Sequence, residues 1–182
     1  MKTLVLGLGN ELLSDDGVGI AAARSLRAGL AGLDDVDVVE SSLAGVALLD
    51  LFLGYDRAII IDCIHARRSP PGSVIELSPA DLDPVAAPSP HFTGLPEMLE
   101  VARQLQLEFP GDIRILAVEA SDIGTIGGGL SDAVRRAVPR VVARVTRMLG
   151  ANAPGAAFRR GRPSPDRARR AWDRSIPRGS SA

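Results

Sequence analysis

Three segments of the chain carry side chains that could bind a divalent cation or activate a water molecule. Two adjacent carboxylates, Asp15 and Asp16, follow an apolar run near the N-terminus. Asp62 follows a run of isoleucines, and His91 follows a proline-rich stretch. Two carboxylates and an imidazole form a suitable three-ligand set for nickel or zinc and leave coordination positions open for a substrate. The residue types therefore indicate a metal site, provided that the fold brings these segments together.

The apolar pattern predicts elements that could do so. Apolar and β-branched runs predict strands over residues 3–7, 36–39, 58–61, 73–77 and 113–118. Helical spacing of apolar residues predicts helices over residues 17–30, 45–53, 91–107 and 130–149. Strands that alternate with helices predict an α/β fold, a three-layer sandwich with helices on both faces of a mostly parallel five-stranded sheet. Ligands of such sheets bind outside the carboxyl ends of the strands, so we expect Asp16, Asp62 and His91 to meet at that edge.

Each of these residues also has a purely structural interpretation. One of Asp15 and Asp16 is expected to cap the helix that starts near Gly17, which leaves the other for function. A carboxylate at the mouth of a buried strand is costly to desolvate unless it is paired or metal-bound, which favours a functional role for Asp62 over a simple turn. His91 could be a helix cap or a core residue. The only other histidine, His65, could replace it, but the following Ala-Arg-Arg indicates a solvated loop.

Other kinds of site fit the sequence less well. Gly7 and Gly9 follow a strand as in a dinucleotide-binding loop, but the position of the third glycine is Leu12, and the acidic residues beyond it would repel a pyrophosphate. A phospho-accepting receiver domain needs a lysine on its last strand, and the only lysine is Lys2. Cys63 and a histidine could form a nucleophilic pair, but a cysteine at a strand end is usually a small buried residue. The sequence contains no Gly-x-Ser-x-Gly or His-Glu-x-x-His motif.

Composition describes one globular domain and a tail. Of the 182 residues, 46% are hydrophobic and 24% are charged, and we expect a single domain over residues 1–150. That part carries 13 basic and 20 acidic side chains, which argues against nucleic acid as the main partner. Residues 151–182 are rich in Arg, Pro and Gly and are expected to be disordered.

Location can also be predicted from composition. The single cysteine excludes a disulfide scaffold. No apolar run reaches the roughly 18 residues of a membrane span, and no signal-peptide core is present. We therefore expect a cytoplasmic protein with no membrane partner.

The order of several motifs resembles a known family. Residues 4–19, Leu-Val-Leu-Gly-Leu-Gly-Asn-Glu-Leu-Leu-Ser-Asp-Asp-Gly-Val-Gly, are similar to the signature of the nickel-iron hydrogenase maturation endopeptidases. Further segments match the family in the same order along the chain. They are Ser-Leu-Ala-Gly (42–45), Ile-Ile-Ile-Asp-Cys (59–63) followed by Pro-Gly-Ser-Val (71–74), Ser-Pro-His (89–91) and Gly-Gly-Leu-Ser (128–131). The resemblance covers residues 1 to about 149.

The resemblance implies both an activity and a site. Its members have a phosphorylase/hydrolase-like sandwich fold, and they trim a C-terminal extension from the large-subunit precursor of a nickel-iron hydrogenase after its metals have been inserted. Their metal-contacting positions correspond to Asp16, Asp62 and His91, and the first of these is often Glu in relatives. These three residues are therefore the expected catalytic and metal-contacting set. The nickel would be carried by the substrate, and the isolated protein could bind another divalent metal such as zinc.

Two other classes of function stay open at this point. The chain could be a nickel-sensing assembly factor, or chaperone, that docks the immature hydrogenase without cutting it. A weaker alternative is a nucleotide-binding α/β protein.

Overall fold

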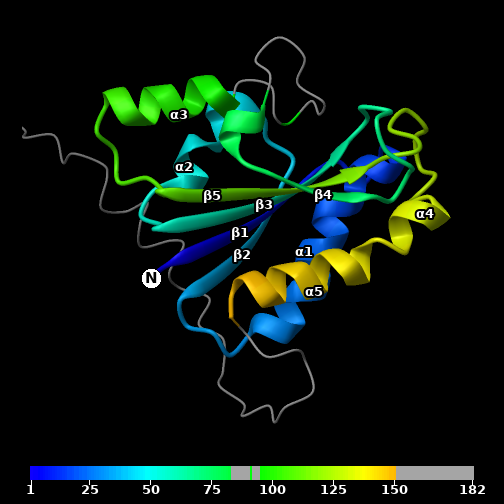
Figure 1. Cartoon of the computed structure of the whole chain (residues 1–182), viewed down its shortest axis with the longest axis horizontal. Coiled ribbons are helices and arrows are strands. Elements are labelled where there is room, and N and C mark those ends of the chain that lie inside the picture. Colours follow the sequence, from blue (N-terminus) through cyan, green and yellow to red (C-terminus); the bar gives the residue numbers. More distant parts are fainter. Residues whose placement is uncertain (83–90, 92–94, 151–182) are drawn as a thin grey trace, which may run out of the picture.

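A five-stranded sheet forms the centre of the computed structural model, which describes residues 1–82, 91 and 95–150 (Figure 1). The strand order is β2-β1-β3-β5-β4. β1 pairs in parallel with β2 and β3, β3 pairs in parallel with β5, and β4 is antiparallel to β5. The strands are β1 (Thr3–Leu8), β2 (Val36–Ser41), β3 (Arg57–Ile64), β4 (Val74–Leu77) and β5 (Asp112–Glu119).

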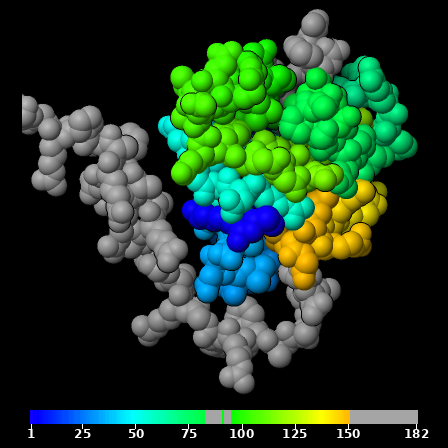
Figure 2. Space-filling view, turned by 60° about the vertical axis from the view of Figure 1, so that its left-hand side comes forward, coloured from blue at the N-terminus to red at the C-terminus, as the bar shows by residue number. Residues whose placement is uncertain are grey.

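Helices cover both faces of the sheet. α1 (Val18–Leu30) and α5 (Val138–Met148) lie on one face, and α2 (Leu49–Phe52) and α3 (Leu95–Gln104) lie on the other (Figure 1). In Figure 2 the dark blue start of the chain lies between the green of α3 and the orange of α5. The shorter elements are η1 (Ser14–Gly17), η2 (Gly45–Leu48), η3 (Pro79–Asp81) and α4 (Asp132–Arg135). The predicted three-layer α/β sandwich with a mostly parallel sheet is confirmed.

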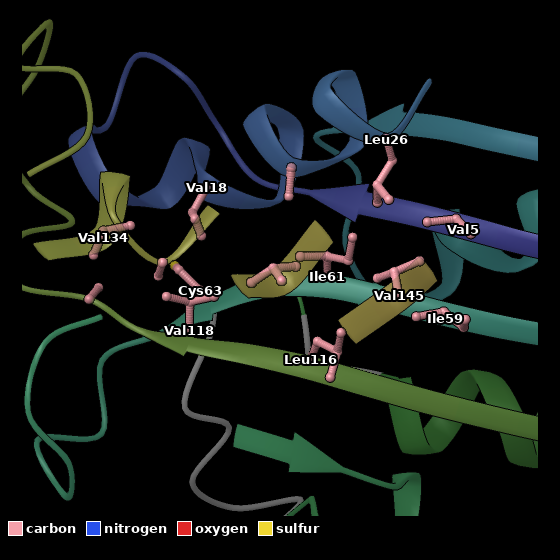
Figure 3. Close-up of a cluster of buried hydrophobic side chains, with 14 of the residues drawn as sticks. Val5, Val18, Leu26, Ile59, Ile61, Cys63, Leu116, Val118, Val134 and Val145 are labelled. Carbon is pink, nitrogen blue, oxygen red and sulfur yellow. The ribbon is translucent and has the colours of Figure 1, made fainter. Parts of the chain in front are cut away.

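The isoleucines of β3 explain why this strand runs through the middle of the molecule. Ile59, Ile60 and Ile61 are all fully buried, and successive side chains point to opposite faces of the sheet. Ile60 joins the cluster under α2 and α3, whereas Ile59 and Ile61 join the cluster under α1 and α5, shown in Figure 3. A strand that is apolar on both faces needs a helix layer on each side, which fixes the three-layer arrangement.

Two glycines let α1 lie directly on the sheet. A Cβ added to Gly7 would be 2.2 Å from the carbonyl oxygen of Gly19. A Cβ added to Gly19 would be 2.1 Å from the carbonyl oxygen of Leu8 and 2.3 Å from that of Ile61. Backbone therefore packs against backbone at the start of α1, and any side chain here would push the helix away from β1 and β3. This contact also fixes η1, which directly precedes α1, at the carboxyl end of β1.

The structure corrects three predicted boundaries. β3 extends to Ile64, so Asp62 lies within the strand, paired with Ala117, rather than after it. The predicted helix over residues 130–149 is two helices, because Pro139 in the first turn of α5 lacks the N–H that a continuous helix needs. The helix expected over residues 91–107 is described from Leu95 to Gln104, and residues 92–94 lie outside the described residues.

The predicted division into a domain and a tail stays a prediction, because residues 151–182 lie outside the described residues. Most of the proline-rich loop before His91 lies outside them as well. Within the described part of the chain, no helix is both long enough and apolar enough to cross a membrane.

Candidate active site

Asp16 is the residue around which the candidate site is arranged. It lies in η1, and only 3% of its surface is exposed. Its Oδ2 accepts a hydrogen bond of 2.8 Å from the backbone N–H of Asn10 and lies 3.3 Å from Nε2 of His91. Its Oδ1 accepts a hydrogen bond from the thiol of Cys63, with Sγ 3.2 Å away. The loop after β1, the end of β3 and His91 thus converge on one carboxylate.

Asp62 brings a second buried carboxylate to the same place. It has no exposed surface, and its Oδ1 accepts a hydrogen bond of 2.8 Å from the backbone N–H of Cys63. Asp16, Asp62 and Cys63 each offer one possible ligand atom, and these atoms lie within 4.8 Å of one another. The sequence interpretation of Cys63 as a small buried residue is correct for its packing, since it lies beside Val18 and Val118 (Figure 3). It missed the sulfur as a possible donor, although the direct adjacency of Cys63 to Asp62 pointed to it.

His91 is held in one orientation by two oxygen atoms. Its Nδ1 lies 3.1 Å from the carbonyl oxygen of Leu43, and only 7% of the residue is exposed. A carbonyl oxygen can only accept, so Nδ1 carries a proton and Nε2 is the nitrogen that faces Asp16. The other histidine, His65, accepts a hydrogen bond from Nε of Arg67 instead. The structure therefore brings His91, rather than His65, to the two carboxylates.

The close contact between these groups changes their protonation. The hydrogen bond to Asp16, with the nearby charge of Asp62, outweighs burial and raises the pKa of His91 to about 9. Burial alone would raise the pKa of Asp16, but hydrogen bonds from His91 and Cys63 outweigh it, and the pKa is lowered. Burial and the Asp62 and Asp16 carboxylates raise the pKa of the Cys63 thiol. Cys63 is therefore a neutral thiol near neutral pH, which argues against a nucleophilic role.

Asp15, the neighbour of Asp16, has a different task. The expectation that one of the two caps the following helix is wrong, because the N-cap of α1 is Gly17 and no side chain caps it. Asp15 is fully buried and accepts hydrogen bonds from the backbone N–H groups of Ser121, Asp122 and Ser131 at 2.7–3.0 Å, and from the Ser131 hydroxyl at 3.0 Å. It ties η1 to the loop between β5 and α4. Sequence reasoning missed this role because the partners are more than 100 residues away.

The donor set has the chemistry of a site for a borderline divalent cation. Asp16 and Asp62 supply carboxylate oxygens, His91 supplies an imidazole nitrogen and Cys63 a sulfur, all types of ligand that zinc and nickel accept. All four side chains are buried, so a cation here would be drawn out of bulk water into a region of negative charge. The arrangement can therefore bind a metal, or hold a carboxylate beside a metal as a general base.

Comparison with known proteins shows which family the chain belongs to. A family model described as hydrogenase maturation protease matches residues 20–148. The chain belongs to the hydrogenase maturation protease family. The hydrogenase 2 maturation protease of Escherichia coli K12 is 31% identical over 120 residues, which make up 65% of this chain and 73% of that protein. The hydrogenase expression/formation protein HupD of Rhizobium leguminosarum is 26% identical over 151 residues, or 81% of this chain and 74% of HupD.

The structural comparison agrees with this family. The hydrogenase maturating endopeptidase HybD from E. coli superposes with a TM-score of 0.71 at 29% identity, covering 82% of this chain and 93% of HybD. The chain is thus a hydrolase of the hydrogenase maturation protease class, and its α/β sheet is the fold of that class. The resemblance seen in the sequence is confirmed.

Proposed function

We propose that this protease removes a C-terminal extension from the large-subunit precursor of a nickel-iron hydrogenase once nickel has been inserted, and that Asp16, Asp62 and His91 contact that nickel. The observation that carries this proposal is the convergence of two buried carboxylates and one imidazole, with Asp16 Oδ2 and His91 Nε2 3.3 Å apart, in a chain of the hydrogenase maturation protease family. A buried cluster of oxygen and nitrogen donors suits an ion that arrives already bound to a substrate and has a coordination position open.

The chain's own groups then supply the hydrolytic chemistry. When His91 contacts the nickel through Nε2, the proton that it shares with Asp16 must leave, because a metal ligand has to be deprotonated. One of the two carboxylates takes a proton from water as the water oxygen attacks the scissile carbonyl carbon. The peptide C–N bond then breaks, and the same carboxylate returns that proton to the amine that leaves. Holding the bond and the water in line supplies much of the rate.

The site also explains why processing would depend on insertion of the metal. Without a cation, His91 is protonated and bound to Asp16, so the three side chains are engaged with one another. The precursor's nickel would break this contact and organise the carboxylates around the peptide to be cut. In the isolated protein the same donors could hold another divalent ion such as zinc. We place the reaction in the cytoplasm, in line with a sequence that has one cysteine and therefore no disulfide framework.

A processing assay with purified nickel-loaded precursor tests the proposal. Asp62→Asn and His91→Gln are expected to leave the precursor at full mass, and His65→Gln is the matched histidine control that should cut as wild type does. Mass spectrometry reads the loss of the extension, and circular dichroism shows that each variant is folded. Normal processing by both site variants would overturn the assignment of the residues.

The same assay separates the protease from a non-cleaving assembly factor. A fall in precursor mass with wild-type protein supports proteolysis. A stable complex with a precursor of unchanged mass would instead support the nickel-sensing chaperone.

A further inference from the structure

A groove lies directly beside the candidate site and has no part in the chemistry described so far. Its volume is about 330 Å³, and it lies between the loop of residues 9–12, which follows β1, and Ser41 and Ser42 at the end of β2. Both walls lead to the site. The backbone of Asn10 donates to Asp16, and the carbonyl of Leu43, the residue after Ser42, holds the ring of His91. The groove is therefore close enough to the site to hold a segment of a polypeptide that has one bond there.

The charges on the groove wall are already paired with one another. The Arg24 guanidinium donates to Glu11 at 2.7 Å and to Glu40 at 2.9 Å, and Arg27 forms a second ion pair with Glu40 at 2.9 Å. A charged side chain in the groove would gain no ion pair there, because the charges of the wall already neutralise one another. The wall therefore favours a peptide whose side chains are uncharged there. Leu12, which is 66% exposed, adds an apolar surface for it.

Asn10 offers the groove an oriented hydrogen-bond donor. Its side-chain carbonyl accepts a hydrogen bond of 3.0 Å from the backbone N–H of Leu12. Because an N–H can only donate, the atom that faces Leu12 must be the oxygen, and the NH₂ group is left for another partner. No residue in the described ranges accepts a hydrogen bond from that NH₂ group. An amide held by its oxygen in this way is suited to donate to a peptide carbonyl.

We propose that this groove binds the extended, uncharged segment of the precursor that adjoins the scissile bond, and that Asn10 donates its side-chain amide to a main-chain carbonyl of that segment. The inference rests on the proposed function, because it takes the precursor as the occupant. It adds a specificity surface outside the metal-contacting residues: the groove recognises the backbone and rejects charge, while the site recognises the ion.

Site-specific crosslinking tests the occupant of the groove. A photoreactive benzoylphenylalanine replaces Leu12 in an Asp62→Asn background, which is expected to hold the uncut nickel-loaded precursor. The matched control carries it at Leu105, which is 64% exposed and lies in the connection that leads from α3 to the amino end of β5, whereas the groove lies at the carboxyl ends of β1 and β2. Mass spectrometry should find crosslinks from position 12 in the residues flanking the cut site and none there from position 105. Crosslinks from position 12 that avoid this segment, or a copurifying complex without any, would overturn the proposal.

Kinetics of two Asn10 variants test the hydrogen bond. Asn10→Asp keeps an oxygen for the N–H of Leu12 but loses the donor, and Asn10→Ala loses the donor without adding charge. Both should raise KM about tenfold and change kcat less than threefold, because uniform binding energy is lost. An unchanged KM, or a fall in kcat alone, would overturn the role of Asn10. Wild-type protein that cuts nothing would instead reject the proposed function, so the two failures are distinguishable.

Discussion

Asp15 and Asp16 are adjacent, identical and almost completely buried, yet their surroundings differ in kind. Asp15 is surrounded by four hydrogen-bond donors from a single distant loop, all of which belong to the fold. Asp16 faces a histidine and a thiol, groups that can exchange a proton or bind a metal. The difference teaches that burial of a carboxylate says little about function. The identity of its partners separates a carboxylate that holds the structure together from one that is available for chemistry.

Removing the Asp16 charge should have the largest effect on activity. Asp16→Asn is expected to lower the rate of precursor processing by about 10²–10⁴-fold, the range typical of a lost acid–base group. The free energy of unfolding should change much less, because the asparagine oxygen can still accept the N–H of Asn10. Single-turnover processing and urea unfolding measure the two effects. If the variant is strongly destabilised but its folded fraction cuts normally, Asp16 has a structural role like that of Asp15.

The matching change at Asp15 should have the opposite outcome. Asp15→Ala leaves three backbone N–H groups and a hydroxyl without their buried acceptor, so we expect a loss of about 3 kcal/mol in the free energy of unfolding. Processing per folded molecule should stay within a few-fold of wild type at low temperature. Full stability together with loss of processing would remove the distinction between the two carboxylates.

The contact between Asp16 and His91 should make the metal-free protein less stable at alkaline pH. A raised pKa of about 9 in the folded chain means that stability from this proton is fully present below the ordinary histidine pKa of 6.5 and is lost as pH rises through 9. The lowered pKa of Asp16 adds stability above 3.8 that is lost on acidification. Urea unfolding in EDTA measures this effect. Between pH 6.5 and 9.5, the free energy of unfolding of wild type should fall by roughly 1–3 kcal/mol more than that of His91→Gln. Parallel curves of the free energy of unfolding against pH for the two proteins would mean that the contact between Asp16 and His91 contributes nothing to stability.

The Ser131 hydroxyl allows the contribution of one of the four hydrogen bonds to Asp15 to be measured by itself. Ser131→Ala removes one of the four hydrogen bonds and keeps the backbone donor, so we expect a cost of about 1 kcal/mol and normal processing. Thermal unfolding of Ser131→Ala beside Asp15→Ala measures the difference. Equal losses in the two variants would show that the hydroxyl alone holds the loop.

The sequence predicted the layers of the fold because the pattern behind them is local. The isoleucines before Asp62 and the apolar stripe of α1 each required burial, whatever lay elsewhere in the chain. The break at Pro139 was visible as a residue but was hidden by an apolar stripe that continues across it. The end of β3 could not be predicted from composition, because it is pairing with β5 that extends the strand through Asp62 to Ile64.

The sequence predicted that Asp16, Asp62 and His91 would lie together, but it did not predict their contacts or the part of Cys63. The carboxyl edge of a parallel sheet was enough to expect Asp16, Asp62 and His91 together. Adjacent aspartates have the same local propensities, so only Ser121 and Ser131, far along the chain, show which of the two is structural. The contact between Cys63 and Asp16 depends in the same way on how η1 lies against β3.

The close backbone contact between Gly7 and Gly19 has a consequence for how the site could fit different metal ions. Since main-chain atoms alone set how near α1 approaches β1 and β3, the backbone that carries Asp16 is held at a fixed distance from the strand that carries Asp62. Only rotation of the carboxylate side chains is then left to fit ions of different radius. Under the proposed function, the protein that delivers the ion would choose which ion it is, and the protease would detect only that an ion lies at the right depth.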